Sequence, residues 1–182
     1  MGVLMKTMIL YKTKYGSTKE YAQWLAEELQ CEMAETETLN AKQLEAYDRI
    51  IIGGGILGGG IRGLSWLKKN YSQLCSKQIA VFGVGITPPS EAYIKSLRLQ
   101  NIGRKFEEIP LFYLRGKWDE KNMTWADHKV CSLMKSNLEK KPEKDLDSSE
   151  AALLEVYTLG MDGALDWASK DQLDPIIQWA KG

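Results

Sequence analysis

The stretch YKTKYGSTKEYA, residues 11–22, decides the fold of this chain. The stretch begins at the end of the apolar run of residues 8–11, which has the composition of a buried strand. The second half of the stretch begins a helical pattern. Between strand and helix lie three hydroxyl residues and a glycine: Thr13, Gly16, Ser17 and Thr18. A helix start needs only one capping side chain, so the surplus indicates that this loop binds an anion.

The chemistry of the loop favours a monophosphate as that anion. Backbone N–H groups at a helix N-terminus point outward, and the helix dipole favours negative charge there. The three hydroxyls can donate to phosphate oxygens, Gly16 lets the backbone approach closely, and Lys14 can partly neutralise the charge. The alternative is that Ser17 only caps the helix, with Glu20 completing a capping box three residues later.

The rest of the chain alternates strand and helix patterns. Strands are predicted at residues 4–11, 31–36, 47–54, 77–85 and 109–116. Helices are predicted at residues 18–29, 41–46, 63–75, 90–99, 126–140 and 170–182. The isoleucines of residues 47–54 follow one another without alternation, which is typical of a parallel strand covered on both faces. The pattern therefore predicts an α/β fold with a three-layer, doubly wound parallel sheet of five strands.

We expect residues 1–182 to form a single domain. Residues 139–150 are charged and interrupted by a proline, and are predicted to be a surface linker. Residues 151–182 would then be a C-terminal helical extension. Its final helix carries Ile176, Ile177 and Trp179, which favour packing onto the core over a membrane-surface role.

The composition excludes several classes of protein. Lys and Arg total 24, as do Asp and Glu, and this zero net charge argues against a nucleic-acid binder. The three cysteines are widely spaced without a CxxC pair, so neither a disulfide framework nor a zinc site is indicated. The single histidine, His128, cannot supply a multi-histidine metal site and is predicted to be structural. No apolar run has the length of a membrane span or a signal peptide, so we expect a cytoplasmic protein.

Two further loops follow predicted strands, at residues 53–60 and 83–88. Both are rich in glycine or hydroxyl residues. Because the carboxyl ends of parallel strands meet at one edge of a sheet, these loops and the first are expected to form one site. The glycine loop is interpreted as a backbone surface that lies against a flat ring, and the alternative is a merely flexible turn.

Glycines within residues 53–65 also have the spacing of two better known motifs, but the other requirements of both motifs are not met. A dinucleotide fingerprint follows the first strand and needs an acid about 20 residues later for the ribose. This loop follows the third strand, and no acid occurs between Arg49 and Glu91. A phosphate-binding P-loop needs a lysine where Leu64 stands.

The T-x-x-G-x-T loop between strand and helix, with two later loops at the same sheet edge, resembles the flavodoxin-like flavoproteins. Thr13, Tyr15, Gly16, Ser17 and Thr18 match the loop that holds the phosphate of FMN in that family, with Tyr15 at a usual hydroxyl position. The resemblance implies the strand order 2-1-3-4-5 and FMN as cofactor, with the two later loops flanking its isoalloxazine ring. The cofactor-binding residues it implies are Thr13, Lys14, Tyr15, Gly16, Ser17, Thr18, Gly54, Gly55, Ile56, Leu57, Gly58, Gly59, Gly85, Ile86 and Thr87. The C-terminal part, with Asp166 and Trp167 before a final helix, is more similar to flavodoxin-domain proteins that include menaquinone-dependent protoporphyrinogen oxidases.

The sequence departs from flavodoxins in two respects. Residues 55–60 and 84–88 contain no aromatic side chain to stack on the flavin, which leaves a ring face for a substrate or partner. The neutral charge also differs from acidic electron shuttles that steer towards basic partners. The insertion at residues 117–126 carries Trp118 and Trp125, which can cover a planar substrate, dock a redox partner or, alternatively, pack onto the core.

The sequence therefore predicts an FMN-binding redox protein that transfers electrons to or from a dedicated partner or a small planar substrate. A quinone- or porphyrinogen-linked oxidoreductase is the first alternative, and a cofactor-free binding module on the same fold is the second. No side chain stands out as an acid or base, so no catalytic residue is assigned.

Overall fold

The computed structural model describes residues 5–160 and 163–182. Residue 4 of the first predicted strand lies outside the described residues. Residues 161 and 162 of the predicted C-terminal extension lie outside them as well.

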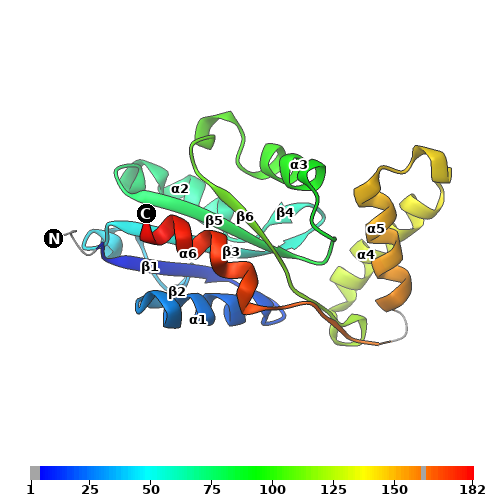
Figure 1. The fold of residues 1–182 in the computed structure, drawn as a ribbon, viewed down its shortest axis with the longest axis horizontal. Coiled ribbons are helices and arrows are strands. Elements are labelled where there is room, and N and C mark those ends of the chain that lie inside the picture. The colour runs from blue at the N-terminus through cyan, green and yellow to red at the C-terminus, as the bar shows by residue number, and fades with distance from the viewer. Residues whose placement is uncertain (1–4, 161–162) are drawn as a thin grey trace.

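A central parallel sheet organises the described chain (Figure 1). Its strands are β1 (Thr7–Lys12), β2 (Glu32–Glu35), β3 (Arg49–Leu57), β5 (Gln78–Gly85) and β6 (Leu111–Arg115). Their order is β2-β1-β3-β5-β6, and each neighbouring pair is parallel. The predicted order 2-1-3-4-5 is confirmed, because β5 and β6 are the fourth and fifth long strands. The short β4 (Gly60–Ile61) pairs antiparallel with the end of β3.

Among the described residues, four helices cover the two faces of the sheet, and two more lie beyond the ends of its strands (Figure 1). The helices are α1 (Ser17–Leu29), α2 (Leu64–Leu74), α3 (Glu91–Asn101), α4 (Trp125–Glu139), α5 (Ser148–Leu159) and α6 (Asp174–Lys181). Short 3-10 turns lie at η1 (Ala41–Leu44), η2 (Arg104–Phe106), η3 (Glu120–Asn122), η4 (Glu143–Asp145) and η6 (Lys170–Leu173). The short helix predicted at residues 41–46 is thus a 3-10 turn.

The consecutive isoleucines of β3 serve two separate cores. Successive residues of a strand point to opposite faces, so Ile50 and Ile52 pack beneath α2 and α3 while Ile51 packs beneath α1 and α6. All three are at most 1% exposed, as the prediction of a strand covered on both faces requires. In α6, Ile176 is fully buried in the second core, which confirms the packing role of the final helix.

The glycine run was expected to be a loop over residues 53–60, and this expectation is wrong for its first half. β3 continues to Leu57, and Gly53 and Gly54 remain paired with β1 and β5. The chain turns only at Gly58 and Gly59, which both have positive φ, and returns as β4. A Cβ atom on Gly53 would lie 2.0 Å from the Phe82 ring, and one on Gly54 would lie 1.8 Å from a backbone oxygen. These two glycines therefore serve close packing.

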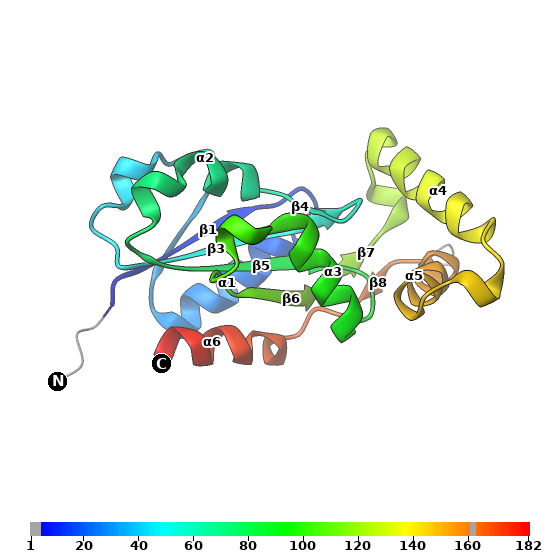
Figure 2. The ribbon, with the colours of Figure 1, turned by 90° about the horizontal axis from the view of Figure 1, so that it is seen from above.

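The segment between β6 and α6 leaves the sheet as a helical hairpin, which Figures 1 and 2 show beyond the end of the strands. It consists of α4 and α5, which residues 140–147 connect. The linker predicted at residues 139–150 is therefore too long, because Glu139 ends α4 and residues 148–150 form the first turn of α5. The chain departs through β7 (Lys117–Trp118) and returns through β8 (Leu165–Asp166), which pair with each other. Trp118 and Tyr157 belong to a third apolar cluster, with ring centroids 5.3 Å apart.

Within residues 5–160 and 163–182, no helix has both the length and the apolar composition needed to cross a lipid bilayer.

Candidate functional site

The first loop leaves the start of α1 without a side-chain cap among the described residues. Its N-cap residue is Gly16, which has φ 97° and donates its N–H to Thr13 Oγ1 at 3.0 Å. The alternative reading, in which Ser17 caps the helix with Glu20, is wrong, because Ser17 is already the first helical residue. Glu20 instead pairs with Lys117, at 2.9 Å between Oε2 and Nζ. The backbone N–H groups in the first turn of α1 can therefore donate hydrogen bonds to an acceptor on a bound ligand.

The first loop lies directly beside the end of β3 and beside Gly116, which follows β6. A Cβ atom on Gly55 would lie 3.5 Å from Thr18 Oγ1, and one on Gly116 would lie 3.5 Å from Ser17 Oγ. A cavity of about 220 Å³ opens where these segments meet. The carboxyl ends of β1, β3 and β5 therefore form a single site, as the parallel topology predicts.

Most of the predicted cofactor residues line this cavity. They are Thr13, Lys14, Tyr15, Ser17, Thr18, Gly55, Ile56, Leu57, Gly58, Gly59, Gly85, Ile86 and Thr87. Two predicted residues are not among the lining residues. Gly16 shapes the loop through its positive φ, and Gly54 lies in β3 beneath the carbonyl of Arg62.

The tip of the β3–β4 hairpin is held by Asn101 at the end of α3, a residue that the sequence analysis missed. Its amide donates to the carbonyl of Gly59 at 2.7 Å, and its oxygen accepts from the N–H of Ile61 at 2.8 Å. Asn101 is only 7% exposed, so both bonds form away from water. These two hydrogen bonds therefore fix the position of the β3–β4 hairpin, which forms one wall of the cavity. A Cβ atom on Gly58 would meet nothing within 4 Å, so the turn leaves open space beside it.

The third segment is fixed through its backbone carbonyls. The hydroxyl of Tyr113 donates to the carbonyl of Thr87 at 2.5 Å, and Nε of Arg115 donates to that of Ile86 at 3.0 Å. Burial raises the pKa of Tyr113, so its hydroxyl stays protonated as the donor. These two hydrogen bonds hold Ile86 and Thr87 in place, and both residues line the cavity.

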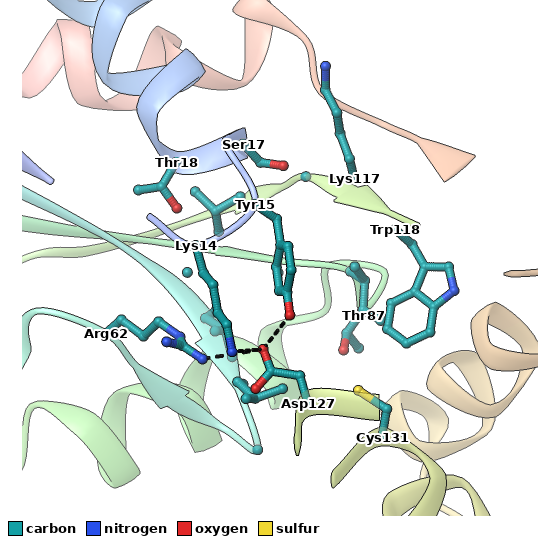
Figure 3. Close-up of a pocket in the computed structure, with 18 of the residues that line it drawn as sticks. Lys14, Tyr15, Ser17, Thr18, Arg62, Thr87, Lys117, Trp118, Asp127 and Cys131 are labelled. Atoms are coloured by element: carbon teal, nitrogen blue, oxygen red, sulfur yellow. Dashed lines mark hydrogen bonds and ion pairs between the residues drawn. The ribbon is translucent and has the colours of Figure 1, made fainter. Parts of the chain in front are cut away.

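A cluster of charged groups lines one side of the cavity (Figure 3). Oδ2 of Asp127 lies 2.8 Å from Nζ of Lys14 and 3.6 Å from Nη2 of Arg62, and it accepts the Tyr15 hydroxyl at 2.7 Å. Burial alone would raise the pKa of the Asp127 carboxyl, but the hydrogen bonds from Lys14 and Tyr15 and the nearby cations hold it below its ordinary value. The sequence analysis missed both Asp127 and Arg62. One signal existed, since Thr124 caps α4 and an acid in the first turn is typical of such a start.

Part of the cavity lining belongs to the third apolar cluster, which α4 and α5 share with the residues beside them. The lining side chains of this part are Ile86, Trp118, Met123, Cys131, Met134, Leu153 and Tyr157. Burial raises the pKa of the Cys131 thiol to about 11, so it stays a neutral thiol near pH 7 and is a poor nucleophile.

The two tryptophans of the predicted insertion have different environments. Trp118 is 5% exposed, and it both packs in the hairpin cluster and lines the cavity. Trp125 is 72% exposed, so the interpretation that both pack onto the core is wrong for Trp125. Tyr93 also lines the cavity and stands edge-on to Tyr113, with ring centroids 5.1 Å apart. The cavity therefore has aromatic side chains from α3, β7 and α5, although residues 55–60 and 84–88 supply none.

Comparisons with known proteins agree with this geometry. A family described as a flavodoxin domain matches residues 8–145. A protoporphyrinogen IX dehydrogenase (quinone) of Escherichia coli K12 is 30% identical over 112 residues, which cover 53% of this chain and 62% of the relative. The match therefore spans less than two thirds of that relative's length.

Solved structures show likeness at low identity. The two-electron reduced flavodoxin of Megasphaera elsdenii has a TM-score of 0.41 and 16% identity, covering 59% of this chain and 82% of the other. The Trp repressor binding protein of Bacillus subtilis has a TM-score of 0.46 and 19% identity, with coverage of 61% and 85%. A flavodoxin domain implies a flavin cofactor and a flavodoxin-like redox role. Because the family matches most of the chain and the sheet has the order of that fold, the chain belongs to the flavodoxin-domain family.

Proposed function

We propose that this protein binds FMN in the cavity at the sheet edge and exchanges electrons with a dedicated partner or a small planar substrate. The observation that carries the proposal is the uncapped N-terminus of α1 among the described residues, with buried Thr18 beside Gly55. Helix N–H groups and a hydroxyl suit a phosphate, and the adjoining glycine backbone suits a flat ring.

The residues of the cavity fit FMN in both of its parts. Thr13, Ser17 and Thr18 would donate to the phosphate, together with the first N–H groups of α1. The backbone from Gly55 to Gly59 would lie against the ring, because no Cβ atoms stand in the way at its glycines. The bound flavin would supply the electron-transfer chemistry, while the protein sets its binding and surroundings.

The side of the cavity beside α4 and α5 supports a second candidate function, that of a quinone-linked oxidoreductase. Trp118, Met134, Leu153 and Tyr157 make an apolar and partly aromatic wall that suits a planar apolar substrate. The E. coli relative is named as a protoporphyrinogen IX dehydrogenase that uses quinone, and its match covers only part of each chain. Oxidation of protoporphyrinogen with a menaquinone analogue would distinguish this enzyme from a carrier that needs a protein partner.

We also propose that the protein resides in the cytoplasm. Its cysteines Cys31, Cys75 and Cys131 are free thiols, as in a reducing compartment.

Reconstitution tests the cofactor directly. The purified protein is expected to be yellow, and protein stripped of flavin should bind FMN more tightly than riboflavin, because only FMN carries the phosphate. Titration by quenching of flavin fluorescence measures both affinities. Equal affinities would contradict the phosphate site, and binding of neither flavin would favour a cofactor-free binding module.

A further inference from the structure

The carboxylate of Asp127 lines the proposed cofactor cavity and contacts two residues of the first loop and Arg62 (Figure 3). Lys14 and Tyr15 belong to the first loop, and Arg62 follows the glycine hairpin. Asp127 itself comes from the first turn of α4, in the helical hairpin outside the sheet. The side chain of Asp127 is 7% exposed, so this acid is a fixed part of the cavity wall.

The ammonium group of Lys14 is the contact that matters for the cofactor. It lies 2.8 Å from Asp127 Oδ2 and donates to Thr124 Oγ1 at 2.9 Å, so both interactions draw it towards α4. Its backbone, however, is part of the loop whose hydroxyls and helix N–H groups would hold the phosphate. A phosphate dianion bound there would attract the same ammonium, and the two anions compete for one cation.

Arg62 does not remove this competition. Its Nη2 lies at 3.6 Å, a longer contact than that of Lys14. The carboxylate therefore keeps Lys14 as its closest cation. It also adds a negative charge near a site that would receive a dianion. Both effects oppose phosphate binding, and neither acts on a ligand without phosphate.

We propose that Asp127 is a specificity-determining residue that sets how strongly the site prefers FMN to riboflavin, by competing with the phosphate for Lys14. This inference rests on the proposed function, since it concerns the same cavity and cofactor. The carboxylate limits the affinity for the phosphate and so allows the flavin to be exchanged.

The variant Asp127→Asn tests the proposal with little change of shape. The asparagine oxygen can still accept the Tyr15 hydroxyl, while the charge that holds Lys14 is lost. We expect the affinity for FMN to rise about three- to tenfold, the scale of one partly exposed charge-assisted hydrogen bond. The affinity for riboflavin should change less than about twofold. Both are measured by fluorescence titration of flavin-free protein at low ionic strength.

A double-mutant cycle with Lys14→Gln identifies the cation involved. The gain from Asp127→Asn should shrink in the Lys14→Gln protein, because the freed ammonium is absent. Asp145→Asn in η4 removes a charge from the same hairpin far from the cluster and should leave both affinities unchanged. If Asp127→Asn does not fold, as judged by circular dichroism, Asp127→Ser carries the same expectation.

The outcomes separate this inference from the proposed function. Wild-type protein that prefers FMN, with unchanged or lower FMN affinity in Asp127→Asn, overturns the role of Asp127 and leaves FMN binding intact. An equal gain for riboflavin also overturns it, because the effect would not depend on phosphate. Wild-type protein that binds the two flavins equally, or binds neither, overturns both proposals.

Discussion

The hydroxyl oxygen of Thr18 lies 3.5 Å from the position that a Cβ atom would occupy on Gly55. This contact joins the first turn of α1 to the end of β3, two elements that the sequence separates. A ligand held by the helix N-terminus is therefore also in reach of the glycine hairpin.

Replacing Thr18 by valine removes the hydroxyl and preserves the shape of the side chain. Thr18 is 2% exposed, so the variant should fold while binding FMN about 1–2 kcal/mol more weakly, the scale of a lost hydrogen bond to a charged group. Riboflavin affinity should barely change in the same fluorescence titration. Thr158→Val, on the exposed side of α5, is the matched control. An equal loss for both flavins would argue against a phosphate at this hydroxyl.

Two glycines of β3 should respond differently to alanine. In Gly55→Ala the new methyl group meets only Thr18 Oγ1 at ordinary contact distance, so it should enter the cavity and weaken flavin binding by about 1 kcal/mol or more without unfolding the protein. In Gly53→Ala the methyl group meets the Phe82 ring, and the free energy of unfolding should fall by about 1–3 kcal/mol. Urea denaturation and flavin titration of both variants measure the contrast. Similar unfolding free energies for the two would contradict the assignment of Gly53 to close packing.

Asn101→Leu should loosen the glycine hairpin. The variant leaves the carbonyl of Gly59 and the N–H of Ile61 without their buried partner, which should lower the free energy of unfolding by about 1–3 kcal/mol. Gln100→Leu removes only a 3.5 Å contact at the exposed side of the hairpin and should cost less than about 0.5 kcal/mol. Urea denaturation at neutral pH compares them, and equal losses would show that Asn101 has no special role.

Stability should depend on pH through Asp127. Its pKa is lowered in the folded protein, so the stabilisation by this carboxylate is fully present above its ordinary value of 3.8 and is lost as the pH falls through the folded pKa. Asp127→Asn should therefore be less stable than the wild type at pH 7, and the difference should narrow below about pH 4. Urea denaturation of flavin-free protein across this range provides the test. A difference that does not vary with pH would mean that the ionised carboxylate contributes nothing.

The fold could be predicted because its signals are local. The strand, hydroxyl loop and helix of residues 8–22 and the unalternating isoleucines of β3 each determine their own conformation, and the parallel topology then places the loop ends together. The start of the loop after β3 was predicted wrongly, because a glycine in the sequence can belong to a strand or to a loop. Only the structure shows that Phe82 packs over Gly53 within the sheet.

The missing parts of the site depend on distant contacts. Asp127 reaches Lys14 and Arg62 only because α4 begins beside the carboxyl ends of the strands (Figure 2), and no periodic pattern encodes that placement. The different environments of Trp118 and Trp125 could not be predicted from the sequence either. They lie in one short segment, yet only the first faces the cavity, because β7 pairs with β8 while α4 turns Trp125 to solvent.

The pairing of Lys117 with Asp166 and of Trp118 with Leu165 brings the two ends of the hairpin segment side by side. A segment whose ends adjoin can be exchanged for a longer or shorter one without moving the framework that carries it. Substitutions in this segment can therefore change the side chains that face the proposed flavin site while the proposed phosphate loop stays the same, so relatives that share this framework are free to differ in what they oxidise or reduce.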